Sequence, residues 1–590
     1  MAKVSLKKLF DKQPKTKAKA KNKMSEKDKK LLIIAFDLLA LFCIVLFCMA
    51  ITPRSFQNDT FYTIKIGQDI RKNGIDYKDH YSWHENLPYM YPHWLYDVII
   101  SLVYDFCGGM QGLYIMTIIF SALLGISLYF TNKKFSKNEF ISFVNTMFQM
   151  YLVKDYIAAR AQLVTFILFV LTVLIIEKFI EKPKVRYGIE LVLIPIIISN
   201  IHSAVFPFYF ILYLPYLGEY VVASIIESHF FHEAYQLYLK TYIKITNKQL
   251  KKAEKKQAIY FQQKLAELQK EVENSNQRFE KYLIKQNDAK KNPYKIKIEK
   301  NNNIQKLFII MIICLFTGLL SPLKDMPYTY TFRIMKGNTT QSISEHLPLT
   351  LINNKQVLIT ITLFIILTMF TKVKLKLRDW FFVGGLTLLA FMSRRQVSML
   401  VLFGGLVFGR IVTELFDKYD KKGTVEIVKY MTTVFGEALT ILLVLLICFT
   451  EYKPIADDTY ISETSYPVQA CEWIKENLDY KNIRIFNDYN YGSYMLFQDI
   501  PVFVDSRCDL YTPEFNGKYD KSKKKFEGQD IFSDYINVSQ ISTYYDSKFD
   551  EYGITHVITK NKSKVHMLIS KNSDYKEIYK DNAFTIYERE

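Results

Sequence analysis

The chain has 590 residues, of which half are hydrophobic and 23% are charged. Such a mixture requires long apolar segments that alternate with very polar ones. The net charge of +19 would indicate a nucleic-acid partner in a soluble protein. Here the lysines cluster in loops between apolar runs, where the positive-inside rule of membrane proteins accounts for them. The composition therefore argues against a nucleic-acid partner and predicts a multi-spanning membrane protein.

Residues 1–30 are rich in lysine and lack apolar periodicity, so we expect a disordered, basic cytoplasmic tail. Leu31 to Ile51 is long enough to cross about 30 Å of hydrocarbon and carries no cleavage signature, which predicts a permanent span. Ten more apolar segments raise the expected number of spans to eleven: 111–131, 138–154, 161–180, 187–200, 203–226, 306–321, 355–371, 379–393, 396–413 and 430–450.

Eleven spans with the N-terminus inside place every basic loop on the cytoplasmic face of a plasma membrane. The transmembrane domain then comprises 31–226 and 306–450, with 52–110 as a large first outer loop. In that loop, the apolar spacing predicts surface helices over 61–71 and 93–106.

Residues 227–305 are an insertion rich in Lys, Gln and Glu, with helical periodicity from about 250 to 283. We expect a solvated or coiled helical hairpin in the cytoplasm. Docking on anionic lipid or on a cytoplasmic partner is the alternative.

Residues 451–590 alternate helical and strand-like patterns, which predicts a small extracytoplasmic α/β domain. The expected fold is therefore mainly α, a multi-spanning membrane protein with a C-terminal α/β domain. Its predicted elements are a helix over 468–477 and strands over 483–487, 502–505, 554–559 and 583–587.

The expected outer segments carry isolated acids, histidines and arginines at the membrane edge. Ionisable groups near hydrocarbon are costly without a role, so their collection on one face predicts a site. These residues are Asp59, His93, Asp155, Arg160, His202, Glu345, Arg394 and Arg395.

Several motifs, in this order, resemble the integral-membrane C-type glycosyltransferases (GT-C), and in particular their bacterial branch with a soluble C-terminal domain. The motifs are NDTFYTIKIGQDIRKNGI, DHYSWHENLPYMYPHWLYDVI, GGMQGLY, AARAQLVTF, SNIHSAVFPF, SPLKDMPYTYTF, ISEHLPL, AFMSRRQVSMLVLF, IRIFNDYNYGSYMLF and PVFVDSRCDLY. The resemblance implies an inverting enzyme that moves a sugar from a polyprenyl-phosphate or polyprenyl-diphosphate carrier to an acceptor outside the membrane. The acceptor is expected to be a cell-envelope glycan, a lipid or a protein.

Breaking a sugar–phosphate bond builds positive charge on the anomeric carbon and negative charge on the leaving phosphate. The site therefore needs a carboxylate for the acceptor hydroxyl and cations for the phosphate. Asp59 lies where the family's acidic residue lies, which makes it the predicted catalytic base. Its alternative role is that of N-cap of a helix from Thr60. Asp76 and Asp79 are rivals in a turn-like stretch that favours ordinary loop roles.

The other residues are predicted to bind substrate. Arg394 and Arg395 suit a phosphate because each offers a fixed fork of donors, although interfacial snorkelling is an equal alternative for either one. Arg160 is interpreted in the same way, and His93, His202 and Glu345 are expected to contact sugar or phosphate.

A divalent metal, Mg²⁺ or Mn²⁺, stays open as a cofactor. In the oligosaccharyltransferase branch of the family, acids from separate outer loops share such an ion, and Asp59, Asp155 and Glu345 offer the hard oxygen ligands it prefers. Other branches work without metal. In addition, His346 replaces the aromatic residue that usually follows the glutamate.

Alternatives to a glycosyltransferase remain from other classes. A lipid-linked saccharide transporter would place ionisable groups near mid-membrane and show broken helices or repeats. A glycan polymerase or ligase, or a non-catalytic scaffold that binds glycan, also fits a multi-spanning chain with an outer domain.

Overall fold

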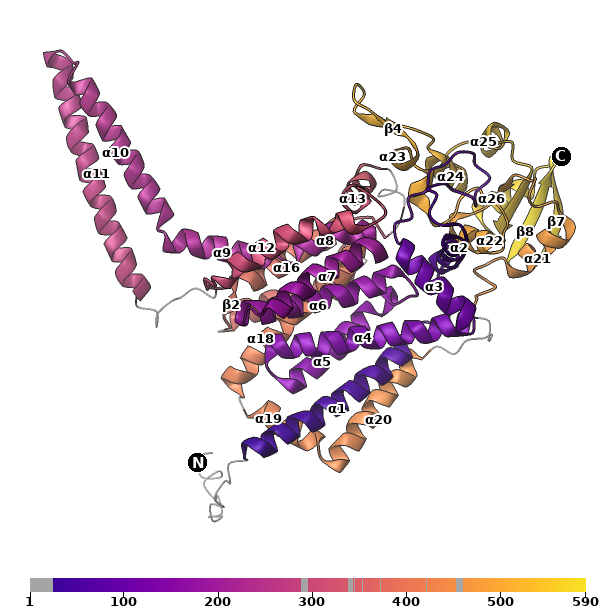
Figure 1. Ribbon diagram of the computed structural model, residues 1–590, viewed down its shortest axis with the longest axis horizontal. Coiled ribbons are helices and arrows are strands. Elements are labelled where there is room, and N and C mark those ends of the chain that lie inside the picture. Colours follow the sequence, from indigo (N-terminus) through magenta and orange to yellow (C-terminus); the bar gives the residue numbers. More distant parts are fainter. Residues whose placement is uncertain are drawn as a thin grey trace, which may run out of the picture.

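The computed structural model describes residues 25–287, 296–337, 343, 345–352, 354–371, 373–420, 422–452 and 460–590. Most of the predicted cytoplasmic tail lies outside these residues. The chain is mainly helical, and its apolar helices lie side by side in one bundle (Figure 1). The bundle contains α1 (Glu26–Ile51), α4 (Met110–Ser136), α5 (Glu139–Val153), α6 (Ala161–Glu181), α7 (Val185–Ile201), α8 (Phe206–Ile211), α9 (Leu214–Glu227), α12 (Asn303–Leu315), α15 (Lys355–Phe370), α16 (Leu377–Met392), α18 (Gly405–Tyr419), α19 (Gly423–Met431) and α20 (Val434–Glu451).

Seven helical segments of the described chain are long and apolar enough to cross a membrane. The other four expected spans fall on the shorter helices α5, α7, α15 and α16. Helix α5 has 15 residues, which gives about 22 Å at 1.5 Å per residue against a hydrocarbon core of about 30 Å. The protein is thus a multi-pass membrane protein, while a total of eleven crossings stays a prediction.

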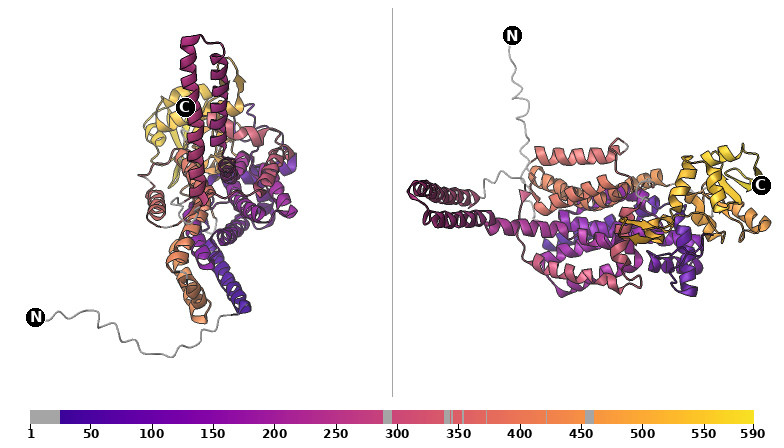
Figure 2. Two further views of the ribbon diagram at one scale, coloured as in Figure 1. Left: turned by 90° about the vertical axis from the view of Figure 1, so that its left-hand side faces the viewer. Right: turned by 90° about the horizontal axis from the view of Figure 1, so that it is seen from above.

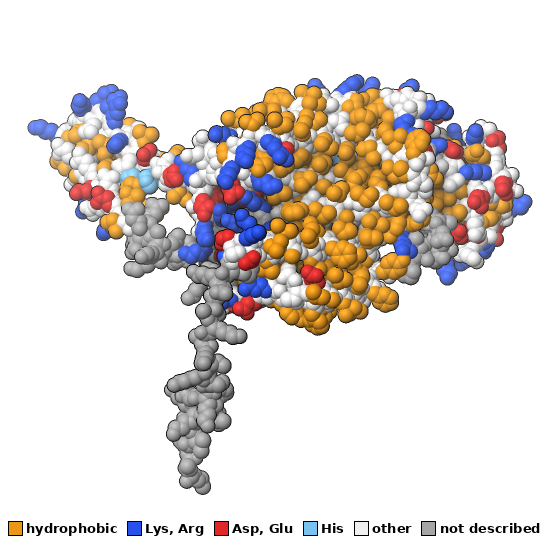
Figure 3. Space-filling model, turned by 60° about the horizontal axis from the view of Figure 1, so that its bottom comes forward, with side chains coloured by type: hydrophobic (Ala, Val, Ile, Leu, Met, Phe, Trp, Pro, Cys, Tyr) orange, Lys and Arg blue, Asp and Glu red, His pale blue; other side chains and the backbone are white. Residues whose placement is uncertain are grey.

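A broad band of hydrophobic side chains covers the outside of the bundle (Figure 3). Large apolar residues of the bundle helices, such as Leu38, Phe42 and Leu446, are more than half exposed. An apolar surface of this extent is normal where lipid tails replace water. Lys and Arg side chains gather at the end of the band nearest the helical hairpin described below (Figure 3), which is the face predicted to be cytoplasmic.

Residues 52–110, predicted to be an outer loop and called the first outer loop below, contain two helices, α2 (Asn58–Asn73) and α3 (Trp94–Phe106), as their periodicity predicted. They pack very closely, since a Cβ atom on Gly67 would lie 1.9 Å from the carbonyl oxygen of Asp97. The N-cap of α2 is Gln57. The alternative role of Asp59 as N-cap is therefore wrong, because the helix begins at Asn58, two residues before the Thr60 start that this role requires.

The 227–305 insertion forms a helical hairpin of α10 (Phe230–Leu250) and α11 (Lys255–Asn287). The hairpin extends from the bundle at the end opposite the C-terminal unit (Figure 2). Next to its base in the sequence, β1 (Ile296–Lys297) pairs in parallel with β2 (Leu375–Lys376). The location of the hairpin in the cytoplasm stays a prediction.

The C-terminal unit contains a four-stranded sheet of order β3-β6-β8-β7 and a separate two-stranded ribbon, β4-β5. Strands β3 and β6 are parallel, and the other pairs of the sheet are antiparallel. The strands are β3 (Ile485–Phe486), β4 (Lys518–Asp520), β5 (Lys525–Glu527), β6 (His556–Lys560), β7 (Tyr575–Lys580) and β8 (Phe584–Arg589). The helices are α21 (Val468–Asn477), α22 (Tyr489–Phe497), α23 (Pro513–Asn516), α24 (Ile531–Gln540), α25 (Tyr545–Tyr552) and α26 (Lys564–Ile569).

The strand expected over 502–505 is absent from the described sheets. Its backbone bonds with the first outer loop instead, since Val502 accepts from Trp83 N at 3.3 Å and donates to Tyr81 O at 3.2 Å. The segment is fully buried at Val502 and Val504. Its apolar pattern therefore reflects packing between the outer loop and the C-terminal unit, and not a place in a sheet.

A buried ion-pair cluster joins the same two parts. Arg507 of the C-terminal unit bonds Asp79 of the outer loop at 2.6 Å and Asp505 at 2.7 Å, and the carboxylates are fully buried. Tyr511 also donates to Asp505, at 2.7 Å. Because an unpaired buried charge is strongly unfavourable, the cluster fixes how the C-terminal unit sits on the outer loop.

Candidate active site

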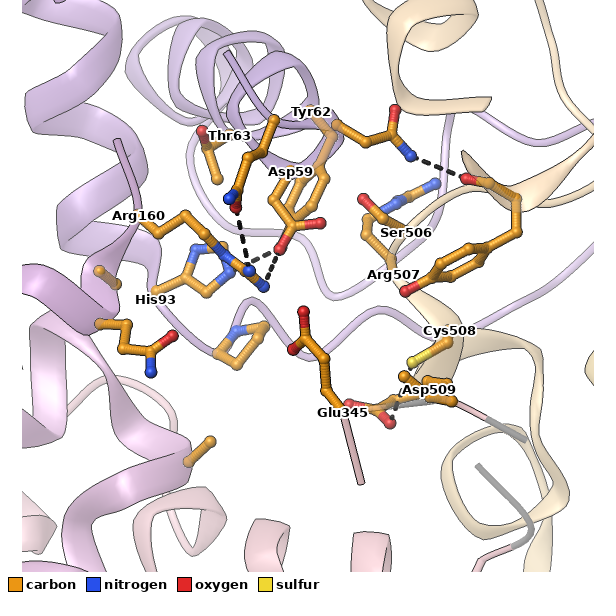
Figure 4. Close-up of a pocket in the computed structure, with 18 of the residues that line it drawn as sticks. Asp59, Tyr62, Thr63, His93, Arg160, Glu345, Ser506, Arg507, Cys508 and Asp509 are labelled. Atoms are coloured by element: carbon orange, nitrogen blue, oxygen red, sulfur yellow. Dashed lines mark hydrogen bonds and ion pairs between the residues drawn. The ribbon is translucent and has the colours of Figure 1, made fainter. Parts of the chain in front are cut away.

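A cavity of about 650 Å³ lies between the first outer loop, the adjacent ends of the bundle helices and the C-terminal unit (Figure 4). Polar and charged side chains from distant parts of the sequence surround it. The predicted residues that line it are Asp59, His93, Arg160, His202, Glu345 and Arg395. The geometry thus gathers six of the eight candidate residues, while their chemical roles stay predictions.

Asp59 and Arg160, which both line the cavity, form an ion pair (Figure 4). Asp59 lies in the first turn of α2, where the positive end of the helix dipole favours a carboxylate. Arg160 precedes α6 and also donates from Nη1 to Gln57 Oε1 at 3.3 Å. Both side chains stay partly exposed to the cavity, at 17% and 25%. The carboxylate is therefore held in one orientation while a substrate can still reach it.

Glu345 and Arg395 come together because two short segments pair through their backbones. Arg395 N donates to Glu345 O at 3.0 Å, and Arg394 N donates to Leu347 O at 3.0 Å. Arg395 lines the cavity, whereas Arg394 does not line it and instead donates from Nε to Pro348 O at 3.4 Å. Of the two arginines, only Arg395 is therefore placed to meet a ligand.

The two predicted histidines are buried in the cavity wall. His202 caps the end of α7, and its Nδ1 is 2.9 Å from the hydroxyl of Thr165. Burial, together with the charge of Arg395, lowers the pKa of His202 well below its usual value. His202 is therefore neutral near pH 7 and offers hydrogen bonds to a ligand but no charge. His93 bonds Tyr62 and Asp97, as described below.

Asp155 does not join the cavity. It lies in the 3₁₀ turn Lys154–Tyr156 and lines a second cavity of about 650 Å³ beside Lys154 and Glu451. The predicted metal trio is thus not assembled, because α5 ends at Val153 and the following turn faces the end of α20. Within the described residues, no group of three His, Cys, Asp or Glu side chains is placed to hold a metal ion.

The C-terminal unit supplies cavity residues that sequence reasoning did not single out: Tyr489, Asn490, Ser506, Arg507, Cys508 and Asp509. Asp509 accepts a hydrogen bond from Tyr330 at 2.6 Å, and burial raises its pKa. Burial, with the charge of Asp509, also raises the pKa of Cys508 well above its usual value. These residues lie in a motif that carried the family resemblance, but only the folded chain brings them opposite Asp59.

Tyr62 of α2 was also missed. It lines the cavity and is 7% exposed. Its apolar neighbours made it look like an ordinary residue of a surface helix, so no feature of the sequence marked it.

The cavity therefore holds a solvent-accessible carboxylate, three arginines (Arg160, Arg395 and Arg507), neutral imidazole and several hydroxyl groups. Such a set can bind an anionic, hydroxyl-rich ligand and can accept a proton.

No protein-family model matches the sequence, and no curated protein matches it. Among solved structures, the chain is similar to an oligosaccharyltransferase of Archaeoglobus fulgidus in the apo form, with 10% identity and a TM-score of 0.48. That match covers 91% of this chain and 70% of the other. A second similar structure is the archaeal oligosaccharyltransferase AglB from the same organism, in complex with an inhibitory peptide and a dolichol-phosphate. It is 9% identical with a TM-score of 0.49, over 95% of this chain and 74% of the other. What this chain does is therefore inferred from its own cavity.

Proposed function

We propose that this protein is an inverting membrane glycosyltransferase. It takes a sugar from a polyprenyl-phosphate or polyprenyl-diphosphate carrier at the outer face of the plasma membrane and transfers it to a cell-envelope glycan, lipid or protein. The observation that carries the proposal is the shared cavity of Asp59, Arg160, Glu345 and Arg395 at one end of the bundle.

The proposed reaction uses Asp59, Arg395 and Arg160, each in a different role. Asp59 takes the proton of the acceptor hydroxyl, whose oxygen then attacks the anomeric carbon from the face opposite the phosphate. As the sugar–oxygen bond to the phosphate breaks, Arg395 binds the charge that develops on the leaving group. Arg160 holds the Asp59 carboxylate in place through their ion pair.

The location of the cavity agrees with this chemistry. A lipid carrier keeps its tail in the hydrocarbon, so its phosphate lies at the membrane edge. The cavity is lined by residues at the ends of the apolar helices and by residues of the polar C-terminal unit. A transporter would instead require ligand-binding groups near mid-membrane.

The decisive experiment compares cell-envelope glycans by mass spectrometry in cells with the protein, without it, and with its Asp59→Asn variant. We expect one sugar to be missing, to the same extent, from the deletion and the variant. An unchanged glycan profile in the deletion would contradict the proposed function.

A scaffold that only binds glycan gives a different result. In that case the Asp59→Asn variant would restore the envelope of the deletion strain, because the protein would still fold and bind.

A further inference from the structure

Three side chains form a hydrogen-bonded chain from the cavity into the protein interior. The Tyr62 hydroxyl lies 2.9 Å from His93 Nε2, and His93 Nδ1 lies 2.6 Å from Asp97 Oδ1. Tyr62 and His93 line the cavity (Figure 4), whereas Asp97 lies behind them and is 0% exposed.

The local fold fixes this arrangement. His93 is the N-cap residue of α3, and Asp97 follows one turn later, on the same face of the helix. Tyr62 projects from α2, which α3 approaches so closely that Gly67 has no room for a Cβ atom. Phe61 and Thr63, on either side of Tyr62 in the sequence, are buried. The ring of Tyr62 therefore has little freedom to move away from His93.

The order of donors along the chain follows from Asp97. A carboxylate accepts hydrogen bonds, so it selects the tautomer of His93 that carries its hydrogen on Nδ1. The lone pair of Nε2 is then free and accepts the hydroxyl hydrogen of Tyr62. The second oxygen of Asp97 has no hydrogen-bond partner among the described residues, so His93 is the group that stabilises this buried acid.

With its hydrogen engaged by His93, the Tyr62 oxygen presents only lone pairs to the cavity. We propose that Tyr62 is the hydrogen-bond acceptor for a hydroxyl group of the substrate, with His93 and Asp97 as positioning residues. This inference rests on the proposed function, because it names a specificity contact within the same cavity. The hydroxyl belongs either to the donor sugar or to the acceptor, which share the same chemistry.

The charged neighbours do not replace this contact. Asp59 pairs with Arg160 and is assigned to the reacting hydroxyl of the acceptor, so it does not serve the hydroxyl that Tyr62 accepts. His202, at the end of α7, lines the same cavity and bonds Thr165. Tyr89 is buried, and its hydroxyl has no hydrogen-bond partner among the described residues. The predicted substrate contact of His93 is thus made through Tyr62.

The first test needs no substrate. The protein is labelled with ¹⁵N-histidine, placed in lipid nanodiscs and studied by ¹⁵N NMR. It contains nine histidines, and the His93 signal is identified as the one that the His93→Gln variant lacks. We expect a protonated Nδ1 and an unprotonated Nε2 near pH 7. In Asp97→Asn we expect a shift toward the Nε2-protonated tautomer, because the amide can donate to the ring. A wild-type His93 that is protonated on Nε2 would overturn the proposal even if the Asp97→Asn variant fails to fold.

The second test measures specificity with synthetic decaprenyl-phosphate glucose, mannose and galactose. For the sugar that is transferred, monodeoxy donors and deoxy acceptors identify the hydroxyl whose loss lowers kcat/KM about tenfold, as expected for one hydrogen bond. In Tyr62→Phe, KM should rise about tenfold and the penalty for that deoxy substrate should disappear. Tyr96→Phe is the matched control, since its hydroxyl is buried outside the cavity.

The two tests fail in different ways. If none of the synthetic donors is transferred or bound, the proposed function fails. The histidine NMR spectrum still decides the direction of the hydrogen bonds that link Tyr62, His93 and Asp97. If transfer occurs and Tyr62→Phe keeps the full discrimination against every deoxy substrate, the hydroxyl subsite is wrong and the transferase stands.

Discussion

At the scale of single residues, the cavity separates side chains that look equivalent in the sequence. Arg394 and Arg395 are neighbours in a motif with no feature that distinguishes them. The 3₁₀ turn Arg394–Gln396 directs them differently, so that only Arg395 lines the cavity. In the same way, Asp59 and Asp155 were both predicted to be ligands of a metal ion, but they line different cavities.

The role of Asp59 gives the first prediction. Asp59→Asn should lower the rate of sugar transfer by about 10² to 10⁴, the contribution of a positioned base, while donor binding persists. Transfer of a radiolabelled sugar by the purified protein measures the rate. Asp105→Asn is the control, because Asp105 pairs with Arg71 away from the cavity. Equal rates for the Asp59 variant and the wild type would contradict the mechanism.

The two neighbouring arginines give the second prediction. Arg395→Ala should weaken binding of the lipid-phosphate donor about 10- to 100-fold, the effect of losing a charged hydrogen bond. Arg394→Ala is the matched control and should change donor affinity less than threefold. Donor titrations of both variants in nanodiscs make the comparison. A larger effect for Arg394 would show that the phosphate binds elsewhere.

At the scale of elements, the first outer loop and the C-terminal unit behave as one packed body. Their shared core joins α2 to α22, where Phe61 contacts the rings of Tyr466 and Tyr494 edge to face. The Arg507 cluster adds a polar clamp in the same region. The cavity exists because both parts contribute walls to it.

The clamp gives the third prediction. Arg507→Leu leaves two buried carboxylates without their partner, which should destabilise the protein by about 3–5 kcal/mol. Arg71→Leu removes an ion pair that is partly exposed, so its cost should be about 0–1 kcal/mol. Thermal unfolding in detergent compares the two variants. Similar melting temperatures would mean that the clamp does not hold the two parts together.

The same cluster gives a pH prediction. Burial alone would raise the pKa of Asp79, but the charge of Arg507 and hydrogen bonds from Ser82 lower it below its usual value near 3.8. Its stabilising contribution is therefore complete above about pH 4 and is lost as the pH falls through the lowered pKa. Limited proteolysis between pH 7 and pH 3 should release the C-terminal unit only at the acid end. Release of the C-terminal unit near pH 6 would show that the titration of a group other than Asp79 loosens it.

At the scale of the whole molecule, the hairpin and the C-terminal unit lie at opposite ends of the apolar bundle (Figure 2). If the bundle spans the membrane, these two parts lie on opposite sides of it. The predicted orientation places the C-terminal unit and the cavity outside and the hairpin in the cytoplasm.

Cysteine labelling of intact cells tests this orientation. A membrane-impermeant thiol reagent should label Lys518→Cys, in β4 of the C-terminal unit, and should label Lys255→Cys, at the start of α11, only after permeabilisation. Replacing the exposed native Cys107 with serine removes a competing thiol, and peptide mapping identifies the labelled site. Labelling at residue 255 in intact cells would reverse the topology. Asn338, the other predicted outer position, lies outside the described residues.

The sequence by itself determined the elements that depend on local periodicity and composition. The apolar runs, the surface helices at 61–71 and 93–106, the hairpin and the helix over 468–477 could be predicted, because each pattern reflects the side that its residues bury. The sequence also identified six residues of the cavity, since isolated charges at a membrane edge stand out against apolar surroundings.

Tertiary structure alone decided which of those residues meet. The backbone pairing of 345–347 with 394–395 selects Arg395 over Arg394. The approach of α3 to Gly67 places His93 beside Tyr62, and the segment at 502–505 packs on the outer loop instead of joining the sheet. Each of these outcomes depends on contacts between residues far apart in the chain. Local patterns carry no record of such contacts, because the energy of a long-range contact exists only once both partners are in place.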